Sequence, residues 1–258
     1  IGTGPGAPRW RLPESIDWLR QASDWVGYRL YLQLLEDLHQ HQLLHKFAMG
    51  KETERVIHAL ELAAEGKNVA LICSGDPGIY ALATLVFEVM DRENRADWCR
   101  VEVRVSPGIT AMQAAAAKIG APLGHDFCAI SLSDLMTPRE VILKRIEAAA
   151  ETDLVIAFYN PVSPKRTELL EKARECLLKF RDPTTPVVLA RNLGRHEETI
   201  RIVDLKDLSH EEIDMLTLVI VGSSETMRYG DPGQSCRLFT PRGYAEKLRN
   251  HDLKEGTG

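Results

Sequence analysis

The turn sequence SGDPGIY at residues 74–80 lies between two apolar runs, residues 69–73 and 81–87. Together the two runs approach the length and hydrophobicity of a membrane-spanning helix. The Asp-Pro-Gly sequence in the middle argues against that interpretation, because each of these residues favours turn geometry for a separate steric reason. The stretch therefore predicts a buried strand, a turn and a helix, in that order.

The same order of strand, glycine-containing turn and helix recurs directly afterwards. The sequence VEVRV at 101–105 predicts a strand, SPGIT follows it as a turn, and residues 110–119 predict a helix that ends at Gly120. Strand-like runs alternate with helix-like segments along the rest of the chain as well. This alternation predicts an α/β protein with mixed, largely parallel sheets.

Apolar runs and helical spacing locate the other expected elements. Strands are expected at 25–27, 69–73, 101–105, 128–132, 154–158, 186–190, 199–203 and 216–221. Helices are expected at 52–64, 79–91, 110–119, 138–150 and 167–180, with a short one near 209–214 and a helical stretch containing Leu30, Leu34, Leu35 and Leu38.

The turn-rich sequence GAPLGHDF at 120–127 interrupts the alternation and predicts a domain boundary. We expect an N-terminal α/β domain over residues 1–122, a C-terminal α/β domain over 123–246 and a polar tail over 247–258. The chain opens without Met on IGTGPG, which resembles the end of a strand that enters a glycine turn. The first strand of the N-terminal domain is therefore expected to be truncated.

Composition and charge exclude several classes of partner. The formal net charge of −5 provides no overall attraction to nucleic acid or to an acidic membrane surface, so neither partner is expected. A hydrophobic content of 44% and a charged content of 27% are typical of a soluble globular protein. The five cysteines are scattered without a CxxC pair, which favours reduced thiols in a cytoplasm over disulfides or a zinc site.

Three histidines, His39, His41 and His45, raise the question of a metal site. His41 and His45 are four residues apart and would share one face if this stretch were a helix. No cysteine or second histidine pair stands nearby to complete a ligand set. A solvated helical face is the better interpretation, and no metal is expected.

Four loops rich in small and turn-forming residues follow expected strands, at 2–8, 74–79, 106–110 and 159–166. Ligands of open α/β sheets bind where loops leave the carboxyl ends of the strands. Helices that begin after such loops also present unpaired backbone N–H groups. The four loops therefore predict a ligand cleft at one edge of the sheet.

Basic residues near the ends of these loops predict an anionic substrate, because arginine and lysine side chains bind carboxylates. His125, which follows Gly124 in a turn, is a candidate acid or base. The candidate substrate-binding residues are Arg29, Lys51, Lys165, Arg166, Arg191 and Arg195.

A nicotinamide-dependent oxidoreductase is one alternative, because GTGPGA matches the dinucleotide fingerprint G-x-G-x-x-A. Pro5 and Pro8 crowd that turn. The nearest acidic residue, Asp24, precedes its strand, whereas a ribose-binding carboxylate follows one. No G-x-S-x-G or P-loop sequence supports a hydrolase or an NTPase. A binding module without catalytic activity is the other alternative.

Taken in order, the loops resemble those of the tetrapyrrole (corrin and porphyrin) methyltransferases, which use S-adenosylmethionine. The resemblance rests on GTGPG, SGDPGIY, SPGITAMQAAAAKIGAPLGHDF, FYNP and LTLVIVG, and it runs from Gly2 to about Tyr244. Within the family, VGYRLYL, YNPVSPKR, DMLTLVIVGSSET and TPRGY are most similar to the precorrin-3B C(17)-methyltransferases of cobalamin biosynthesis. Their cobalt-dependent counterparts, and methyltransferases that act at another ring carbon, remain open as alternatives.

The resemblance implies two α/β domains with S-adenosylmethionine in the cleft between them, a tetrapyrrole substrate and a homodimer. It also implies methylation at ring position 17 with contraction of the macrocycle, from precorrin-3B to precorrin-4. Asp76 and His125 are the candidate catalytic residues. The sequence RNLG departs from the family's commoner Asn-Gly pair, and this departure affects the assignment of Asn192 and Gly194 to the cofactor site. The implied cofactor-binding residues are Pro5, Ser74, Gly75, Asp76, Ile79, Thr110, Ala111, Tyr159, Asn160, Asn192 and Gly194.

Overall fold

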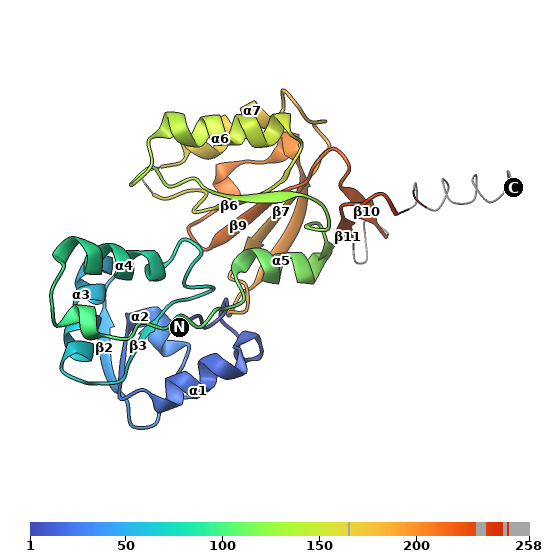
Figure 1. Ribbon diagram of the computed structural model, residues 1–258. Coiled ribbons are helices and arrows are strands. Elements are labelled where there is room, and N and C mark those ends of the chain that lie inside the picture. Colours follow the sequence, from blue (N-terminus) through green and yellow to red (C-terminus); the bar gives the residue numbers. More distant parts are fainter. Residues whose placement is uncertain (165, 231–235, 245–246, 248–258) are drawn as a thin grey trace, which may run out of the picture. The chain divides into compact units, whose positions relative to one another are not determined.

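A computed structural model describes residues 1–164, 166–230, 236–244 and 247 of the chain (Figure 1). The contacts divide the chain into two compact units. The N-terminal unit comprises Ile1–Ala114 and Leu193–Glu197, and the second unit comprises the rest. The boundary expected at residue 122 thus falls within the second unit. Of the expected tail at 247–258, only Lys247 is among the described residues.

The N-terminal unit is built on a parallel sheet of three strands in the order β2-β1-β3. These are β1 (Asp24–Tyr28), β2 (Leu43–Phe47) and β3 (Val69–Ile72). Asp24 pairs with Leu43 on one side and with Val69 on the other, so β1 is the central strand. The strands expected at 25–27 and 69–73 are confirmed.

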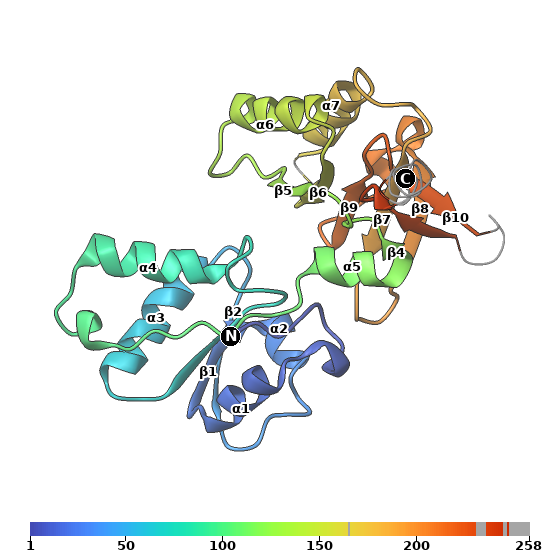
Figure 2. The ribbon, with the colours of Figure 1, turned by 45° about the vertical axis from the view of Figure 1, so that its right-hand side comes forward.

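Helices cover both faces of this sheet, as Figures 1 and 2 show. Alternate residues of a strand point to opposite faces. Trp25 and Ile72 pack with Leu19 and Leu32 on the face of α1 (Pro13–Gln21) and α2 (Arg29–Gln33). Val26 packs with Ala59 and Leu62 of α3 (Glu52–Ala64) on the other face. Helix α4 (Leu82–Glu93) joins α3 in a cluster with Val56, Leu60, Val86 and Val89.

The second unit contains a five-stranded sheet in the order β5-β6-β9-β7-β8. Strands β5 and β6 are parallel, and the other neighbouring pairs are antiparallel. The strands are β5 (Phe127–Ser131), β6 (Val155–Tyr159), β7 (Pro186–Arg191), β8 (Thr199–Asp204) and β9 (Thr217–Val221). With a parallel first sheet and a mixed second one, the predicted α/β fold class is confirmed.

Two helices, α6 (Arg139–Glu151) and α7 (Glu168–Leu177), pack side by side against this sheet (Figure 1). Ile142, Ile146, Phe158, Leu169 and Leu170 form the centre of that core. Helix α5 (Ala111–Ile119) joins the two units in sequence. A smaller sheet contains β4 (Gly120–Ala121), β10 (Met227–Tyr229) and β11 (Arg237–Phe239).

Several sequence-based expectations are wrong in detail. Residues 101–105 form no strand within the described part of the chain. The stretch at 43–47 is strand β2, so His41 and His45 do not share a helix face. Strand β2 was missed because its polar His45 and Lys46 hide the period-two pattern of a strand. Strands β4, β10 and β11 were not foreseen, and helix α4 begins at Leu82 because the preceding residues form the turn.

The imidazole of His45 contacts two other side chains of the protein, an arrangement that differs from the metal site considered from the sequence. Its Nε2 atom lies 2.8 Å from Oδ1 of Asp24, and its Nδ1 atom lies 2.8 Å from Nε2 of His58. The hydroxyl of Ser23 also donates to Asp24, over 2.7 Å. In the described residues, no group of three His, Cys, Asp or Glu side chains is placed to hold a metal ion. None of the described helices is long and apolar enough to cross a membrane.

Asp24 therefore makes the stability of the N-terminal unit depend on pH. Burial opposes the charged form of this carboxyl group, which is 2% exposed, but the hydrogen bonds from Ser23 and His45 outweigh burial and lower its pKa below the usual 3.8. A carboxyl group whose pKa is lower in the folded state stabilises the protein above its unfolded pKa. That stabilisation is lost as the pH falls through the folded-state value.

We expect Asp24→Asn to lower the free energy of unfolding by about 2 kcal/mol near neutral pH, because a charge-assisted pair is lost. Urea unfolding should show this deficit shrinking as the pH falls from about 5 toward 3. Asp91→Asn, on the exposed side of α4, is the matched control and should change little at either pH. A deficit for Asp24→Asn that is the same at both pH values would contradict the account.

Candidate functional site

The first glycine loop lies against the turn that follows β3. The N–H of Thr3 donates to the carbonyl of Cys73 over 3.0 Å, and its hydroxyl donates to the same oxygen over 2.9 Å. Gly4 and Gly75 exchange backbone hydrogen bonds in both directions, over 3.3 and 2.8 Å. Both glycines have a φ of +70°, a conformation that side chains disfavour. The two loops are therefore held together by backbone, and both need glycine.

Asp76 ties a third loop to this pair. One carboxylate oxygen accepts the N–H of Gly78 in its own turn, over 2.7 Å. The other accepts the N–H of Gly108 in the SPGIT loop, over 3.0 Å. Each carboxylate oxygen thus has a backbone donor, and the side chain fixes the position of one loop relative to the other. This geometry makes Asp76 a positioning residue.

The approach of these loops leaves no room for side chains at two more glycines. A Cβ atom on Gly108 would lie 2.0 Å from the carbonyl oxygen of Gly75. A Cβ atom on Gly2 would lie 2.7 Å from the nitrogen of Gly108. Gly75 differs, because a Cβ there would meet only the Cα of Thr110, at 3.8 Å. Gly75 therefore borders open space next to the SPGIT loop.

Residues 193–197 return to the N-terminal unit and contact the same loops. Arg195 donates from Nε to the carbonyl of Pro5 and from Nη2 to the hydroxyl of Ser74, each over 2.9 Å. Its guanidinium carbon lies 5.9 Å from the ring centre of Tyr31. Gly194 has a φ of +68°, and a Cβ there would lie 2.8 Å from the nitrogen of Ala7. This segment braces the first glycine loop.

Three more predicted residues lie beside these loops, Ile79 in the turn before α4 and the other two at the start of α5. The N–H of Ile79 donates to the carbonyl of Asp76 over 3.3 Å, which closes the turn. Thr110 is buried at 3% exposure, and its carbonyl accepts the N–H of Ala114 in the first turn of α5. Ala111 is the first residue of α5. The N-terminal unit thus gathers Pro5, Ser74, Gly75, Asp76, Ile79, Thr110, Ala111 and Gly194.

The other predicted cofactor residues belong to the second unit. Tyr159 is the last residue of β6, and Asn160 follows it with a φ of +51°. The side-chain amide of Asn160 donates to the hydroxyl of Ser131, at the end of the neighbouring strand β5, over 3.0 Å. Asn192 is buried, with a φ of +53°, and its N–H donates to the carbonyl of Leu216. In this unit, the loops after β6 and β7 therefore each begin with an asparagine in the left-handed backbone conformation.

A comparison with known protein families agrees with these loops. The sequence model of the tetrapyrrole (corrin/porphyrin) methylases matches residues 1–209, which is most of the chain. The chain belongs to this family. The family and the resemblance inferred from the loop sequences are therefore confirmed.

Similar proteins and a solved structure extend the match over almost the whole chain. A precorrin-3B C(17)-methyltransferase of Sinorhizobium is 42% identical, over 95% of this chain and 96% of its own. A probable cobalt-factor III C(17)-methyltransferase of Salmonella typhimurium is 45% identical, over 95% and 98%. The crystal structure of the methyltransferase CobJ matches with a TM-score of 0.86 and 41% identity, over 93% and 97%. The chain spans only 45% to 48% of the length of several other curated relatives.

Two of the basic candidates, Arg166 and Arg191, have partners within the second unit. Arg166 donates to the carbonyl of Leu132 and lies 3.5 Å from Asp134, and burial lowers its pKa. Arg191 donates from Nε to Asp214 over 2.6 Å. These contacts give both arginines a structural task, and their substrate-binding role stays a prediction.

The remaining candidates lie in different places. Arg29 begins α2 directly after β1, at the carboxyl edge of the parallel sheet. Lys51 is exposed and pairs with Glu54 on α3. Lys165 is outside the described residues. His125 is exposed in the turn before β5, and its Nδ1 accepts the N–H of Asp126 over 2.8 Å.

Sequence reasoning missed two features of this site. Gly2 and Gly108 were quoted within loops but were not selected, although their contacts leave no space for a side chain. Arg195 was selected as a substrate ligand, a role that stays a prediction, and its hydrogen bonds to Pro5 and Ser74 were not foreseen. The glycine in SPGIT was a usable signal for the first feature. The second needed contacts across more than a hundred residues, which no local pattern contains.

We expect Arg195→Met to loosen the first glycine loop, because methionine keeps the apolar stem but loses both donors. The free energy of unfolding should fall by about 1–2 kcal/mol. Amide exchange at Gly75, whose N–H donates to Gly4, should become faster. Arg201→Met removes a surface pair with Glu212 and should cost about 0.5 kcal/mol or less. Unchanged exchange at Gly75 in Arg195→Met would show that the guanidinium does not brace the loop.

Proposed function

We propose that the protein is an S-adenosylmethionine-dependent methyltransferase that methylates precorrin-3B at ring position 17 and contracts the macrocycle to precorrin-4, in cobalamin biosynthesis. One observation carries the proposal: the match to a precorrin-3B C(17)-methyltransferase covers 95% of this chain and 96% of that protein, at 42% identity. The 0.86 TM-score against the methyltransferase CobJ supports the same activity.

The geometry of the N-terminal unit suits the methyl donor. Methyl transfer from a sulfonium to carbon is an in-line displacement, in which the donor loses its positive charge. Alignment of donor and acceptor supplies up to about 7–11 kcal/mol of such a barrier. Loops held by backbone hydrogen bonds and by Asp76, with open space beside Gly75, provide a rigid surface for that alignment. No strong acid or base is required at the methyl group.

The proposed donor site uses residues of both units. The N-terminal unit contributes the glycine loop at Pro5, the turn from Ser74 to Ile79, and the start of α5. The second unit contributes Tyr159 and Asn160, which its sheet holds at the end of β6. A cleft between the two units for S-adenosylmethionine follows from this assignment and belongs to the proposal.

Ring contraction needs a proton-transfer group, and the two candidates differ in how they are held. Asp76 accepts two backbone N–H groups from two loops, which suits a positioning role. His125 accepts an N–H at Nδ1, so in its neutral form the proton is on Nε2. Within the proposal we assign proton transfer to His125, whose imidazole is exposed.

A cobalt-containing substrate is the second candidate. The relative of Salmonella typhimurium that is named as a probable cobalt-factor III C(17)-methyltransferase is 45% identical, close to the 42% of the Sinorhizobium protein. Both substrates are tetrapyrroles with acidic side chains, so the basic residues do not separate them. A direct comparison of the turnover of the two substrates separates the two candidates.

Incubation with labelled S-adenosylmethionine and either precorrin-3B or cobalt-factor III tests the proposal. We expect one labelled methyl group at ring position 17, with a contracted ring, from precorrin-3B. Faster turnover of cobalt-factor III would select the second candidate. Methylation at another carbon without contraction would contradict both. Binding of NAD(H) but not of S-adenosylhomocysteine in a thermal-shift comparison would instead favour an oxidoreductase.

We also propose that the enzyme is a cytoplasmic homodimer. The scattered cysteines, free among the described residues, suit a reducing compartment. Light scattering coupled to size exclusion measures the mass directly. A mass near twice the 28.9 kDa of one chain is expected.

The variant Gly75→Ala distinguishes an effect on the proposed donor site from a general loss of stability. Gly75 and Gly50 have φ values of +70° and +80°, and neither would meet a close atom with an added Cβ. Alanine at either position should therefore cost a similar strain, about 1–2 kcal/mol. Only Gly75→Ala places a methyl group beside the proposed donor, so its affinity for S-adenosylhomocysteine should fall about tenfold or more. Equal affinities in calorimetry for the two variants would remove Gly75 from the donor site.

A further inference from the structure

The carboxyl edge of the parallel sheet carries a buried guanidinium whose hydrogen bonds are incomplete. Arg55 lies in the first turn of α3, and its side chain is 4% exposed. Its Nη2 atom donates to the carbonyl of Ala48, the residue after β2, over 3.3 Å, and lies 3.6 Å from a carboxylate oxygen of Glu52. Among the described residues, the buried Nε atom has no hydrogen-bond partner. The Nη1 atom bonds to none of them either, but it is not buried, so a ligand can reach it.

This incomplete set of partners makes the burial of Arg55 costly. A guanidinium has five N–H donors and cannot lose its proton in a protein. Burial of a charged group with unpaired donors costs free energy. Glu52 compensates little, because its side chain is 45% exposed and its carboxylate also accepts the N–H of Gly50. Arg55 therefore indicates a place for an anion.

A tyrosine with an unpaired hydroxyl lies beside this arginine. Tyr31 belongs to α2, and its ring packs edge-to-face against that of Tyr28, with the ring centres 5.2 Å apart. The guanidinium carbon of Arg195 lies 5.9 Å from the ring centre of Tyr31. Burial raises the pKa of the Tyr31 phenol, and the charges of Arg195 and Arg55 act in the opposite direction. The hydroxyl thus keeps its proton near neutral pH, and it makes no hydrogen bond within the described part of the chain.

These side chains gather where the three parallel strands end. Tyr28 is the last residue of β1, Arg55 bonds to the residue after β2, and the charge of Arg55 also acts on Cys73, directly after β3. Ligands of open α/β sheets bind at this edge. Arg29, exposed at the start of α2, adds a further positive charge. The carboxylate of Asp76 bonds to two backbone N–H groups, so it does not complete this set.

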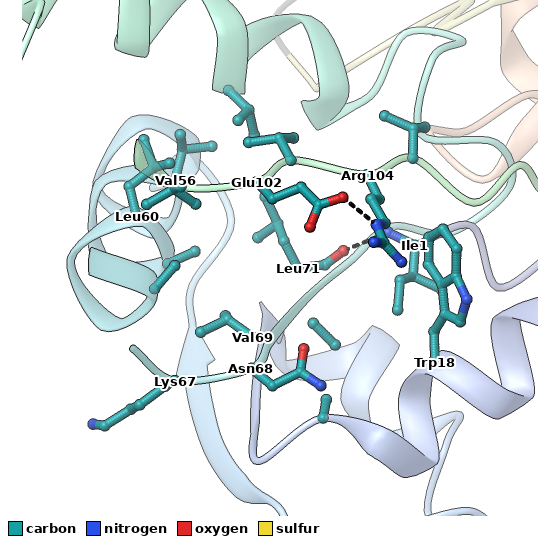
Figure 3. Close-up of a pocket in the computed structure, with 18 of the residues that line it drawn as sticks. Ile1, Trp18, Val56, Leu60, Lys67, Asn68, Val69, Leu71, Glu102 and Arg104 are labelled. Atoms are coloured by element: carbon teal, nitrogen blue, oxygen red, sulfur yellow. Dashed lines mark hydrogen bonds and ion pairs between the residues drawn. The ribbon is translucent and has the colours of Figure 1, made fainter. Parts of the chain in front are cut away.

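The cavity between β3 and residues 100–105, which Figure 3 shows, holds its cations differently. Arg104 is 65% exposed and donates from Nε to Glu102 over 2.7 Å. Lys67 is also exposed, and its Nζ atom lies 3.3 Å from Glu65. Both cations are hydrated and paired, so neither requires a ligand. Burial without a full set of partners distinguishes Arg55 from them.

We propose that Arg55 and Tyr31, with Arg195 beside them, form a subsite that binds one carboxylate side chain of the tetrapyrrole substrate. The subsite rests on the proposed function, which supplies a substrate with acidic side chains. A guanidinium binds a carboxylate through parallel N–H bonds, and the neutral phenol donates a further hydrogen bond. Arg195 contributes mainly charge, because its Nε and Nη2 atoms already bond to Pro5 and Ser74. S-adenosylmethionine also carries a carboxylate, so binding of the donor is measured separately.

Fluorescence titration with uroporphyrin III tests the subsite on the full chain, because every side chain of this tetrapyrrole ends in a carboxylate. Arg55→Met should raise the Kd about tenfold or more, since a charge-assisted pair is lost. Tyr31→Phe removes only the hydroxyl and should raise the Kd about threefold to tenfold. Arg104→Met is the matched control, since it removes the same charge from an exposed place and should change the Kd about twofold or less. Calorimetry should give the same affinity for S-adenosylhomocysteine in all of these proteins.

The stability of the free protein separates ligand binding from a structural role. Arg55→Met removes a buried and incompletely paired charge, so the Tm should stay the same or rise. A structural ion pair with Glu52 predicts a lower Tm instead. Tyr31→Phe loses no hydrogen bond among the described residues and should keep its Tm, so its effect on binding can be measured even if Arg55→Met folds poorly.

The proposal would be overturned if wild-type protein did not bind uroporphyrin III, or if the Kd of Tyr31→Phe or Arg55→Met equalled that of Arg104→Met. A lower Tm of Arg55→Met would assign this arginine to the fold and would also overturn it. Weaker binding of S-adenosylhomocysteine by Arg55→Met would assign the subsite to the methyl donor. None of these measurements depends on turnover or on the ring position that is methylated. A failure of the C(17) assignment in the labelling experiment would therefore be distinguished from a failure of the subsite.

Discussion

The close approach of three glycine backbones determines how the N-terminal unit is assembled around its loops. Gly2, Gly75 and Gly108 come from segments far apart in sequence, and a Cβ atom on Gly2 or Gly108 would lie 2.8 Å or less from the carbonyl oxygen of Gly75. Backbone groups can approach this closely only where side chains are absent. The carboxylate of Asp76 then fixes the arrangement, because it bonds to Gly78 and Gly108 at once. The loops form one rigid surface, and a donor bound there would meet backbone atoms at fixed positions.

This arrangement also explains which parts of the fold could be predicted from the sequence. The helix at 52–64 and the strands at 155–159 and 217–221 agree closely with prediction, because buried apolar runs and amphipathic periods are local patterns. Strand β2 could not be found in that way, since His45 points to Asp24 and His58 and its polarity hides a strand. The glycine turns were visible, but their mutual contacts were not, because contacts between residues this far apart in sequence leave no local pattern.

The site shows the same division between local and distant information. Ser74, Gly75 and Asp76 could be selected as candidates because their turn follows a buried strand. The role of Arg195 depended on two partners, Pro5 and Ser74, that lie more than a hundred residues earlier. An arginine near a loop predicts an anion when only the sequence is considered. In the folded protein its fixed set of donors serves equally well to join two loops.

The wrongly predicted strand at 101–105 is informative for a different reason. Its alternation of valine with charged residues is that of a strand, and Val105 remains 45% exposed in the structure. A strand requires a neighbour to pair with, and next to this segment the described structure has the hydrogen bond from the N–H of Gly2 to the carbonyl of Ser106. A local signal then failed because its partner, and not its own residues, decides whether the strand forms.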